Sequence, residues 1–156
     1  MQEPIWMDAA DAVIIHDLQL AAHGGSAGVR DAGLLESAMA RPRNIWAYTE
    51  SALSLSTLAS AYAFGISANH PFLDGNKRTA LVVSFAFLDV NGLEVTASQE
   101  EAYLTILGLA AGEITEAQLA VWFADRGESD QSPESSSLFA LAPALGFEAL
   151  IARSGG

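Results

Sequence analysis

Apolar residues recur every three or four positions along most of this chain, which is the spacing of one face of an α-helix. A first helix is expected to begin with Asp8 as its N-cap and to end at the glycine pair 24–25. A second helix is expected from Asp31 to Arg41, because the next residue, Pro42, lacks the backbone N–H that a helix interior needs.

The rest of the pattern predicts one short extended segment and four more helices. The segment Arg43–Thr49 mixes aromatic with polar residues and is expected to be extended, as a small hairpin or flap. The helices are expected at Ser51–Ala68, at Asn76–Asn91, from a Ser98–Glu101 capping box to Gly112, and from a Thr115–Gln118 capping box to Gly127. No strand-like alternation of useful length is present. The expected fold is therefore all-α, a compact bundle of about six helices with a flap before the central helix pair.

The composition divides the chain into a folded domain and a tail. Residues 1–127 have the length and apolar content of one compact domain. Residues 128–137, ESDQSPESSS, are a hydrophilic linker, and residues 138–156 form an apolar C-terminal segment. A lone helix of that length is not stable in water, so this segment is expected to dock on the domain, dock on a partner, or remain mobile.

Charge and cysteine content exclude several classes of function. The chain carries 19 acidic against seven basic residues, a net charge of −12, which disfavours nucleic acid as a direct partner and an anionic membrane as a surface. Residues 51–73 lack charges and are long enough to cross a bilayer, but their polar content favours a buried helix over a membrane span. The absence of cysteine and of a recognisable signal peptide favours the reducing cytoplasm as the location.

The chemistry is concentrated in the stretch His70–Ala80, HPFLDGNKRTA. The Asp74-Gly75 dipeptide predicts a turn that leads straight into a helix, and Lys77 and Arg78 lie in the first turn of that helix. Two cations there oppose the helix dipole, so the pattern predicts a site for a strongly anionic group such as phosphate. Asp74 is a natural ligand for Mg²⁺ on such phosphates, and the imidazole of His70 can accept a proton near neutral pH.

Each of these residues also has a plainer interpretation. His70 and Asp74 are compatible with an ordinary loop and turn, Asn76 with a helix cap, and the two cations with solvated charges. His16 and His23, on the first helix, are interpreted as packing or surface residues, because no metal-binding cluster surrounds them. Arg41 and Arg43, on either side of Pro42, are candidates for contacting a target protein or a nucleotide.

The segment HPFLDGNKR resembles the signature of the Fic/Doc superfamily, namely His, any residue, Phe, any residue, Asp or Glu, Ala or Gly, Asn, Gly or Lys, Arg. Lys77 resembles the death-on-curing (Doc) branch, where adenylylating relatives usually have glycine, and the resemblance covers about residues 8–126. It implies ATP and Mg²⁺ as cofactors, His70 as the general base, and Asp74 as the metal ligand. It implies further that the nucleotide is bound by Gly75, Asn76, Lys77 and Arg78.

The resemblance also implies a function. It indicates a toxin of a type II toxin–antitoxin system that transfers a phosphate from ATP to a hydroxyl of a target protein, elongation factor Tu, and so inhibits translation. Gly75 resembles the adenylylating branch instead, so AMP transfer is the alternative, and an inactive binding module is a third. The chain lacks the inhibitory pattern of many Fic relatives, which predicts a separate antitoxin partner. A competing hypothesis is that residues 138–153 lie in the groove where the antitoxin helix would bind.

Overall fold

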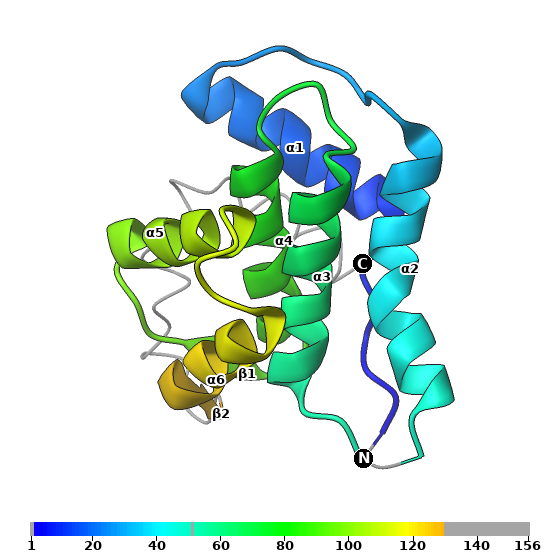
Figure 1. Ribbon diagram of the computed structural model, residues 1–156, viewed down its shortest axis with the longest axis vertical. Coiled ribbons are helices and arrows are strands. Elements are labelled where there is room, and N and C mark those ends of the chain that lie inside the picture. Colours follow the sequence, from blue (N-terminus) through cyan, green and yellow to red (C-terminus); the bar gives the residue numbers. More distant parts are fainter. Residues whose placement is uncertain (1, 51, 130–156) are drawn as a thin grey trace.

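The computed structural model describes residues 2–50 and 52–129 and is predominantly helical (Figure 1). Most of the expected linker and the whole apolar segment 138–156 lie outside these described residues. The elements in chain order are α1 (Ala9–His23), α2 (Ala32–Tyr48), α3 (Leu55–Asn69), α4 (Asn76–Val90), β1 (Leu93–Val95), α5 (Gln99–Ala110), α6 (Glu116–Arg126) and β2 (Gly127–Ser129).

Short polar side chains begin most of the helices, as expected from the sequence. Asp8 and Asp31 are the N-caps of α1 and α2, and the capping box at Thr115–Gln118 forms in full at the start of α6. The box expected at Ser98–Glu101 forms on one side only. The Ser98 hydroxyl accepts from the backbone N–H of Glu101 at 3.1 Å, while the Glu101 carboxylate pairs with Arg126 at 2.8 Å.

The expected end of the second helix and the expected flap were wrong. α2 continues through Pro42 to Tyr48, so the segment Arg43–Thr49 is helical up to its last residue. Pro42 cannot donate to the carbonyl of Ala38, but it is buried, and α3 packs closely against that turn at Gly65. A Cβ at Gly65 would stand 3.2 Å from the Ala38 carbonyl oxygen. Packing against α3 therefore compensates for the hydrogen bond that proline removes.

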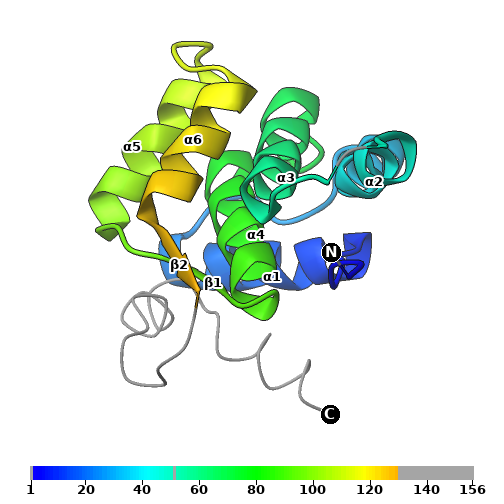
Figure 2. The same cartoon turned by 90° about the horizontal axis from the view of Figure 1, so that it is seen from below.

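The predicted central pair is confirmed as α3 and α4, which pack along each other in the middle of the molecule (Figures 1 and 2). α2 covers one side of α3, α1 crosses α4, and α5 and α6 cover the remaining side. α4 is buried all round from Thr79 to Leu88, and α3 starts at Leu55 with Ser54 as its N-cap, a few residues later than expected. The fold is the expected all-α bundle, and α4 is its core.

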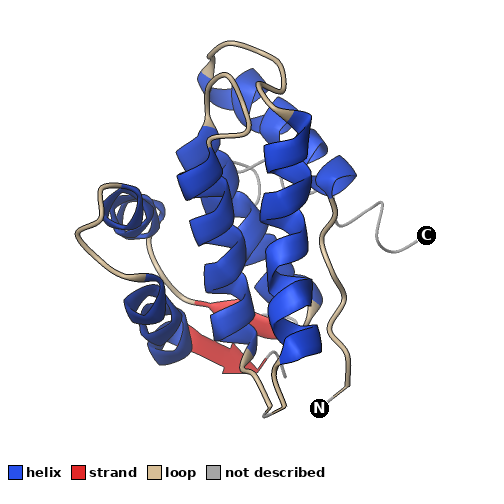
Figure 3. Cartoon of the chain, turned by 45° about the vertical axis from the view of Figure 1, so that its right-hand side comes forward, coloured by secondary structure: helices blue, strands red, loops and turns tan. Residues whose placement is uncertain are grey.

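Two short strands, β1 and β2, were not predicted (Figure 3). They pair antiparallel with Leu93 opposite Ser129 and Val95 opposite Gly127. Three residues are too few to show an alternating pattern, and the pairing partner lies more than thirty positions away in sequence. The small sheet joins the end of α6 to the segment that follows α4.

The charge-free stretch from residue 52 onward lies within the globular fold. It supplies α3, whose buried face includes Leu58, Tyr62 and Ile66. Among the described residues, no helix combines the length and the apolar character that crossing a bilayer requires.

A buried tyrosine fastens the N-terminal segment to this core. The Tyr62 hydroxyl accepts from the backbone N–H of Met7 at 2.9 Å and lies 3.2 Å from the Met7 carbonyl oxygen, to which it donates. Burial raises the pKa of Tyr62 to about 12, because the phenolate would lose its hydration. The neutral hydroxyl is thus part of the folded state.

The raised pKa of Tyr62 predicts a loss of stability at high pH. The folded pKa, about 12, exceeds the value of 10.0 for a free tyrosine, so the stabilisation is complete below pH 10 and disappears as the pH rises through 12. The full loss is about 3 kcal/mol. Denaturant unfolding between pH 9 and 11.5 should show wild type losing more stability than Tyr62→Phe, which is itself less stable at pH 7 by about 1–3 kcal/mol because Met7 loses its partner.

Tyr48→Phe is the matched control, because Tyr48 is 87% exposed and its hydroxyl holds nothing in the described structure. Its stability should follow that of wild type across the whole pH range. Parallel curves for wild type and Tyr62→Phe would contradict the assigned role of Tyr62.

Candidate active site

All six residues predicted to form a site line one cavity of about 540 Å³ at the end of the central helix pair. The loop between α3 and α4 forms its floor, the last turn of α1 and Gly24-Gly25 form one wall, and Tyr103 of α5 closes another. The predicted residues in this lining are His70, Asp74, Gly75, Asn76, Lys77 and Arg78. The residues that the motif places close in sequence therefore also line one cavity in the folded protein.

His70 ends α3 in a left-handed conformation, with φ 47° and ψ 56°. It is the one non-glycine residue with a positive φ in the part of the chain that the structure describes. This conformation costs about 1–2 kcal/mol for an L-residue, and Pro71 disfavours the right-handed helical conformation as the alternative for His70. The abrupt turn exposes the imidazole to the cavity.

Arg30 holds the end of α3 in this conformation. Its Nε donates to the His70 carbonyl oxygen at 2.7 Å, and its Nη2 donates to the Asn69 carbonyl oxygen at 2.8 Å. These oxygens belong to the end of the helix, where carbonyl groups lack intrahelical donors and cations are favoured. No periodicity or motif in the sequence indicated this role, since Arg30 lies forty positions from His70.

The loop between α3 and α4, which carries the motif and is called the motif loop, lies beside an extended segment. This segment is residues 28–31, which precede α2, and not the expected flap Arg43–Thr49. The Pro71 carbonyl oxygen accepts from the backbone N–H groups of Arg30 and Asp31 at 2.7 and 3.1 Å. The N–H of Leu73 donates to the carbonyl oxygen of Gly28 at 3.1 Å, and Val29 forms a β-bridge with Phe72. The motif loop is thus half of a two-stranded arrangement.

The Asn76 side chain binds the loop backbone. Its Oδ1 accepts from the N–H of Phe72 at 3.0 Å, and its Nδ2 donates to the carbonyl oxygen of the same residue at 3.0 Å. Asn76 is buried, so this amide fixes the loop, and the contribution of Asn76 to the cavity is its position in the first turn of α4. Phe72 itself is buried in the hydrophobic core and anchors the loop there.

The Asp74 carboxylate faces the cavity from the turn that starts α4. Oδ1 accepts from the N–H of Gly75 at 2.9 Å, and Oδ2 lies 3.4 Å from the N–H of Ser26. A Cβ at Gly25 would stand 2.8 Å from Oδ2, so only glycine leaves room for the carboxylate in this position. In the sequence, the glycine pair 24–25 indicated only the end of a helix.

Lys77 and Arg78 provide positive charge that no carboxylate of residues 2–50 or 52–129 neutralises in an ion pair. The ion pairs of the described residues involve other side chains, although the chain as a whole carries a net charge of −12. Arg78 lies over the ring of Tyr103, 4.3 Å from its centroid, which fixes the guanidinium at the cavity wall. Gly75 is the N-cap of α4 and has no side chain to accept a hydrogen bond, so no capping side chain occupies the first N–H groups of this helix. Cations and helix N-terminus together favour an anion.

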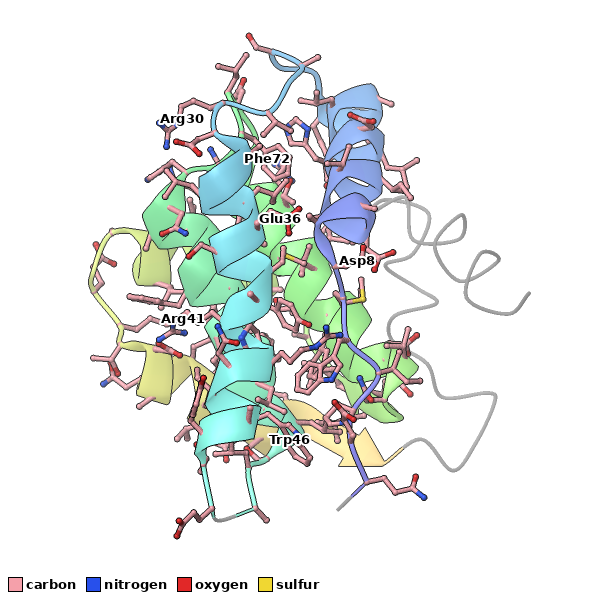
Figure 4. All side chains as sticks on the ribbon, turned by 90° about the vertical axis from the view of Figure 1, so that its right-hand side faces the viewer. Asp8, Arg30, Glu36, Arg41, Trp46 and Phe72 are labelled. Atoms are coloured by element: carbon pink, nitrogen blue, oxygen red, sulfur yellow. The ribbon has the colours of Figure 1, made fainter. Side chains whose placement is uncertain are left out.

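Arg41 and Arg43, the other candidate contact residues, lie outside this cavity. Arg41 forms a two-fold ion pair with Glu116 of α6, both N···O distances being 2.6 Å, and Arg43 lies over the ring of Trp6. In Figure 4, Arg30 and Phe72 lie at one end of the molecule, whereas Arg41 lies about half-way along α2. Both arginines therefore have structural contacts away from the cavity.

The donor set of the cavity fits Mg²⁺ that arrives with phosphates. Within the described ranges, no three acidic or histidine side chains gather into a cluster that could hold a metal ion by themselves. Mg²⁺ is commonly held by one or two carboxylates, with the other positions filled by phosphate oxygens and water. The exposed Asp74 carboxylate lines the same cavity as Lys77 and Arg78, which form no ion pair with any described carboxylate, and this matches that arrangement.

Comparison with known proteins agrees with this geometry. Residues 6–88 match the model of the Fic/DOC family. The chain is 36% identical to the "Protein kinase doc" of Escherichia phage P1 over 110 residues, which cover 70% of this chain and 86% of that protein. It is 40% identical to the "Toxin Doc" of Mycolicibacterium smegmatis over 76 residues, covering 49% of this chain and 58% of that protein. The chain belongs to the Fic/DOC family, with Doc toxins among its relatives.

Proposed function

We propose that this protein is a toxin that transfers the γ-phosphate of ATP to a hydroxyl of a target protein. One observation carries the proposal, namely that an exposed imidazole, a carboxylate and two cations line a single cavity of about 540 Å³, and that neither cation is paired with a carboxylate of the described residues. Two relatives named as a protein kinase and as a toxin support it. The target expected from the resemblance is elongation factor Tu, and a separate antitoxin is the expected partner.

The residues of this chain can divide the reaction among them. The imidazole of His70 would accept the proton of the attacking hydroxyl. Lys77 and Arg78 would bind the phosphates, Arg78 through two parallel N–H donors and Lys77 as a point charge. Asp74 would hold Mg²⁺, which when bound neutralises phosphate charge. Catalysis of phosphoryl transfer is mostly positioning and charge stabilisation, and a loop held as rigidly as this one suits that task.

AMP transfer is the alternative, because Gly75 is the residue expected in adenylylating relatives. Gly75 has φ 77°, and a Cβ there would lie 3.6 Å from the His16 ring, an ordinary contact. Space alone therefore does not require glycine at this position, whereas the backbone conformation favours it. This observation leaves the identity of the transferred group to experiment.

Intact-mass measurement of elongation factor Tu, after incubation with this protein, ATP and Mg²⁺, tests the proposal directly. We expect the mass of one phosphate to be added by wild type and by Arg43→Ala, and no addition by His70→Ala, which removes the base. An added AMP would select the alternative activity. If the target stays unmodified and wild type does not bind ATP, the remaining interpretation is that the protein is an inactive binding module.

Measurement of ATP binding tests the phosphate-binding role of Arg78 separately from catalysis. Arg78→Ala should weaken ATP binding by about 10–100-fold, because a charge-assisted hydrogen bond contributes about 1.5–3 kcal/mol. Isothermal titration calorimetry in the presence of Mg²⁺ measures the change. Arg43→Ala is the matched control, since Arg43 is exposed, lies over Trp6 and stays outside the cavity. Equal affinities of the two variants would contradict the phosphate role of Arg78.

Arg30 is expected to affect turnover more than nucleotide binding. Arg30→Ala frees the carbonyl oxygens of Asn69 and His70, so the imidazole loses its fixed position while Lys77 and Arg78 keep theirs. We expect kcat to fall about tenfold or more and the Kd for ATP to stay within about twofold. Steady-state kinetics and calorimetry on the same preparation measure the two values. A parallel loss of both would show that Arg30 supports the whole loop.

A further inference from the structure

A buried histidine lies directly beneath the Asp74-Gly75 turn. His16, in the middle of α1, is 1% exposed, and its Nε2 lies 2.7 Å from the carbonyl oxygen of Asp74. Its ring stacks on that of Phe72 with 3.9 Å between the centroids and 6° between the planes. One side chain thus contacts two parts of the motif loop, from a helix fifty-eight positions earlier in sequence.

The contact with Asp74 fixes which nitrogen carries the proton. A carbonyl oxygen can only accept a hydrogen bond, so Nε2 must be the donor. Nδ1 lies 3.9 Å from Oδ1 of Asp17, which is too far for a hydrogen bond. The position of His16 is therefore defined by one N–H donor and by one flat face.

That donor controls the orientation of the Asp74 carboxylate through a single rigid unit. The carbonyl of Asp74 and the N–H of Gly75 belong to the same planar peptide group. The N–H of Gly75 donates to Oδ1 of Asp74 at 2.9 Å. When His16 fixes the direction of the Asp74 carbonyl oxygen, it therefore also fixes the direction of the Gly75 N–H. That N–H in turn fixes the position of the Asp74 carboxylate through its hydrogen bond. Glycine on one side of this peptide allows it to rotate, so it needs a partner that fixes its direction.

We propose that His16 is a positioning residue for the metal ligand, acting through the Asp74-Gly75 peptide. This inference rests on the proposed function in one respect, because it assumes that Asp74 binds Mg²⁺ with ATP. Partners that orient a ligand commonly change metal affinity by about 10–100-fold when they are removed. His16 acts at one remove from the carboxylate and is not itself placed among the groups that touch substrate.

Two substitutions separate the hydrogen bond from the packing. His16→Phe keeps a flat ring on Phe72 and loses the donor, whereas His16→Gln keeps an N–H donor near the position of Nε2 and loses the ring. Hydrogen exchange at the Gly75 amide should be faster in His16→Phe than in wild type and close to wild type in His16→Gln. The Mg²⁺ concentration needed for half-maximal ATP binding should rise about tenfold in His16→Phe only.

Hydrogen exchange at Gly75 and the Mg²⁺ dependence of ATP binding distinguish a failure of the proposed function from a failure of the positioning role of His16. If wild type binds no Mg²⁺ with ATP, the proposed function is overturned, while exchange at Gly75 still decides the role of His16. Unchanged exchange in His16→Phe, or equal effects of the two substitutions on both readouts, would overturn the positioning role.

A measurement on the wild-type protein covers the case in which His16→Phe does not fold. Nitrogen-detected NMR of ¹⁵N-labelled protein should show the His16 proton on Nε2, protected from exchange with solvent. A proton on Nδ1 alone, or rapid exchange at Nε2, would overturn the inference.

Discussion

The site depends on one constraint, that the polar backbone groups of an irregular loop must find partners once the loop is packed against a core. The loop between α3 and α4 cannot use a regular ladder, so its groups bind to side chains and to one extended segment. Arg30 binds the oxygens at the end of α3, Asn76 binds both groups of Phe72, and His16 binds the oxygen of Asp74. Each of these side chains comes from a different element, and together they leave the loop little freedom to move.

The helix that follows the loop supplies a rigid base for it. α4 is buried without interruption from Thr79 to Leu88, so its first turn cannot shift without disturbing the core. The N–H groups and cations at that first turn therefore keep a fixed place relative to His70. Hydroxyls within the core are accommodated locally, as when Ser84 donates to the carbonyl oxygen of Ala80 at 2.8 Å.

Two pairs of cations in this acidic protein serve distinct purposes. Arg41 pairs with Glu116 and joins α2 to α6, and Arg126 pairs with Glu101 and joins α6 to α5. Lys77 and Arg78 have no such partner among the described residues, and the aromatic face of Tyr103 holds Arg78 without neutralising it. A contact with a ring leaves a guanidinium available to an anion, which a carboxylate would not.

Local features of the chain were sufficient to predict the helices, most of their caps and the six motif residues in the lining of the cavity. Periodicity reports which face a helix buries, and the residues of the motif are neighbours in sequence, so both could be found without a structure. The length of α2 could not be predicted, because the packing of α2 against α3 outweighed the unfavourable effect of Pro42 on a helix. The roles of four other residues could not be predicted either, namely those of His16, Arg30, Gly25 and Tyr103. Their roles come from partners brought close only by folding, such as the Asp74 oxygen beside His16, and no local pattern encodes such a distance.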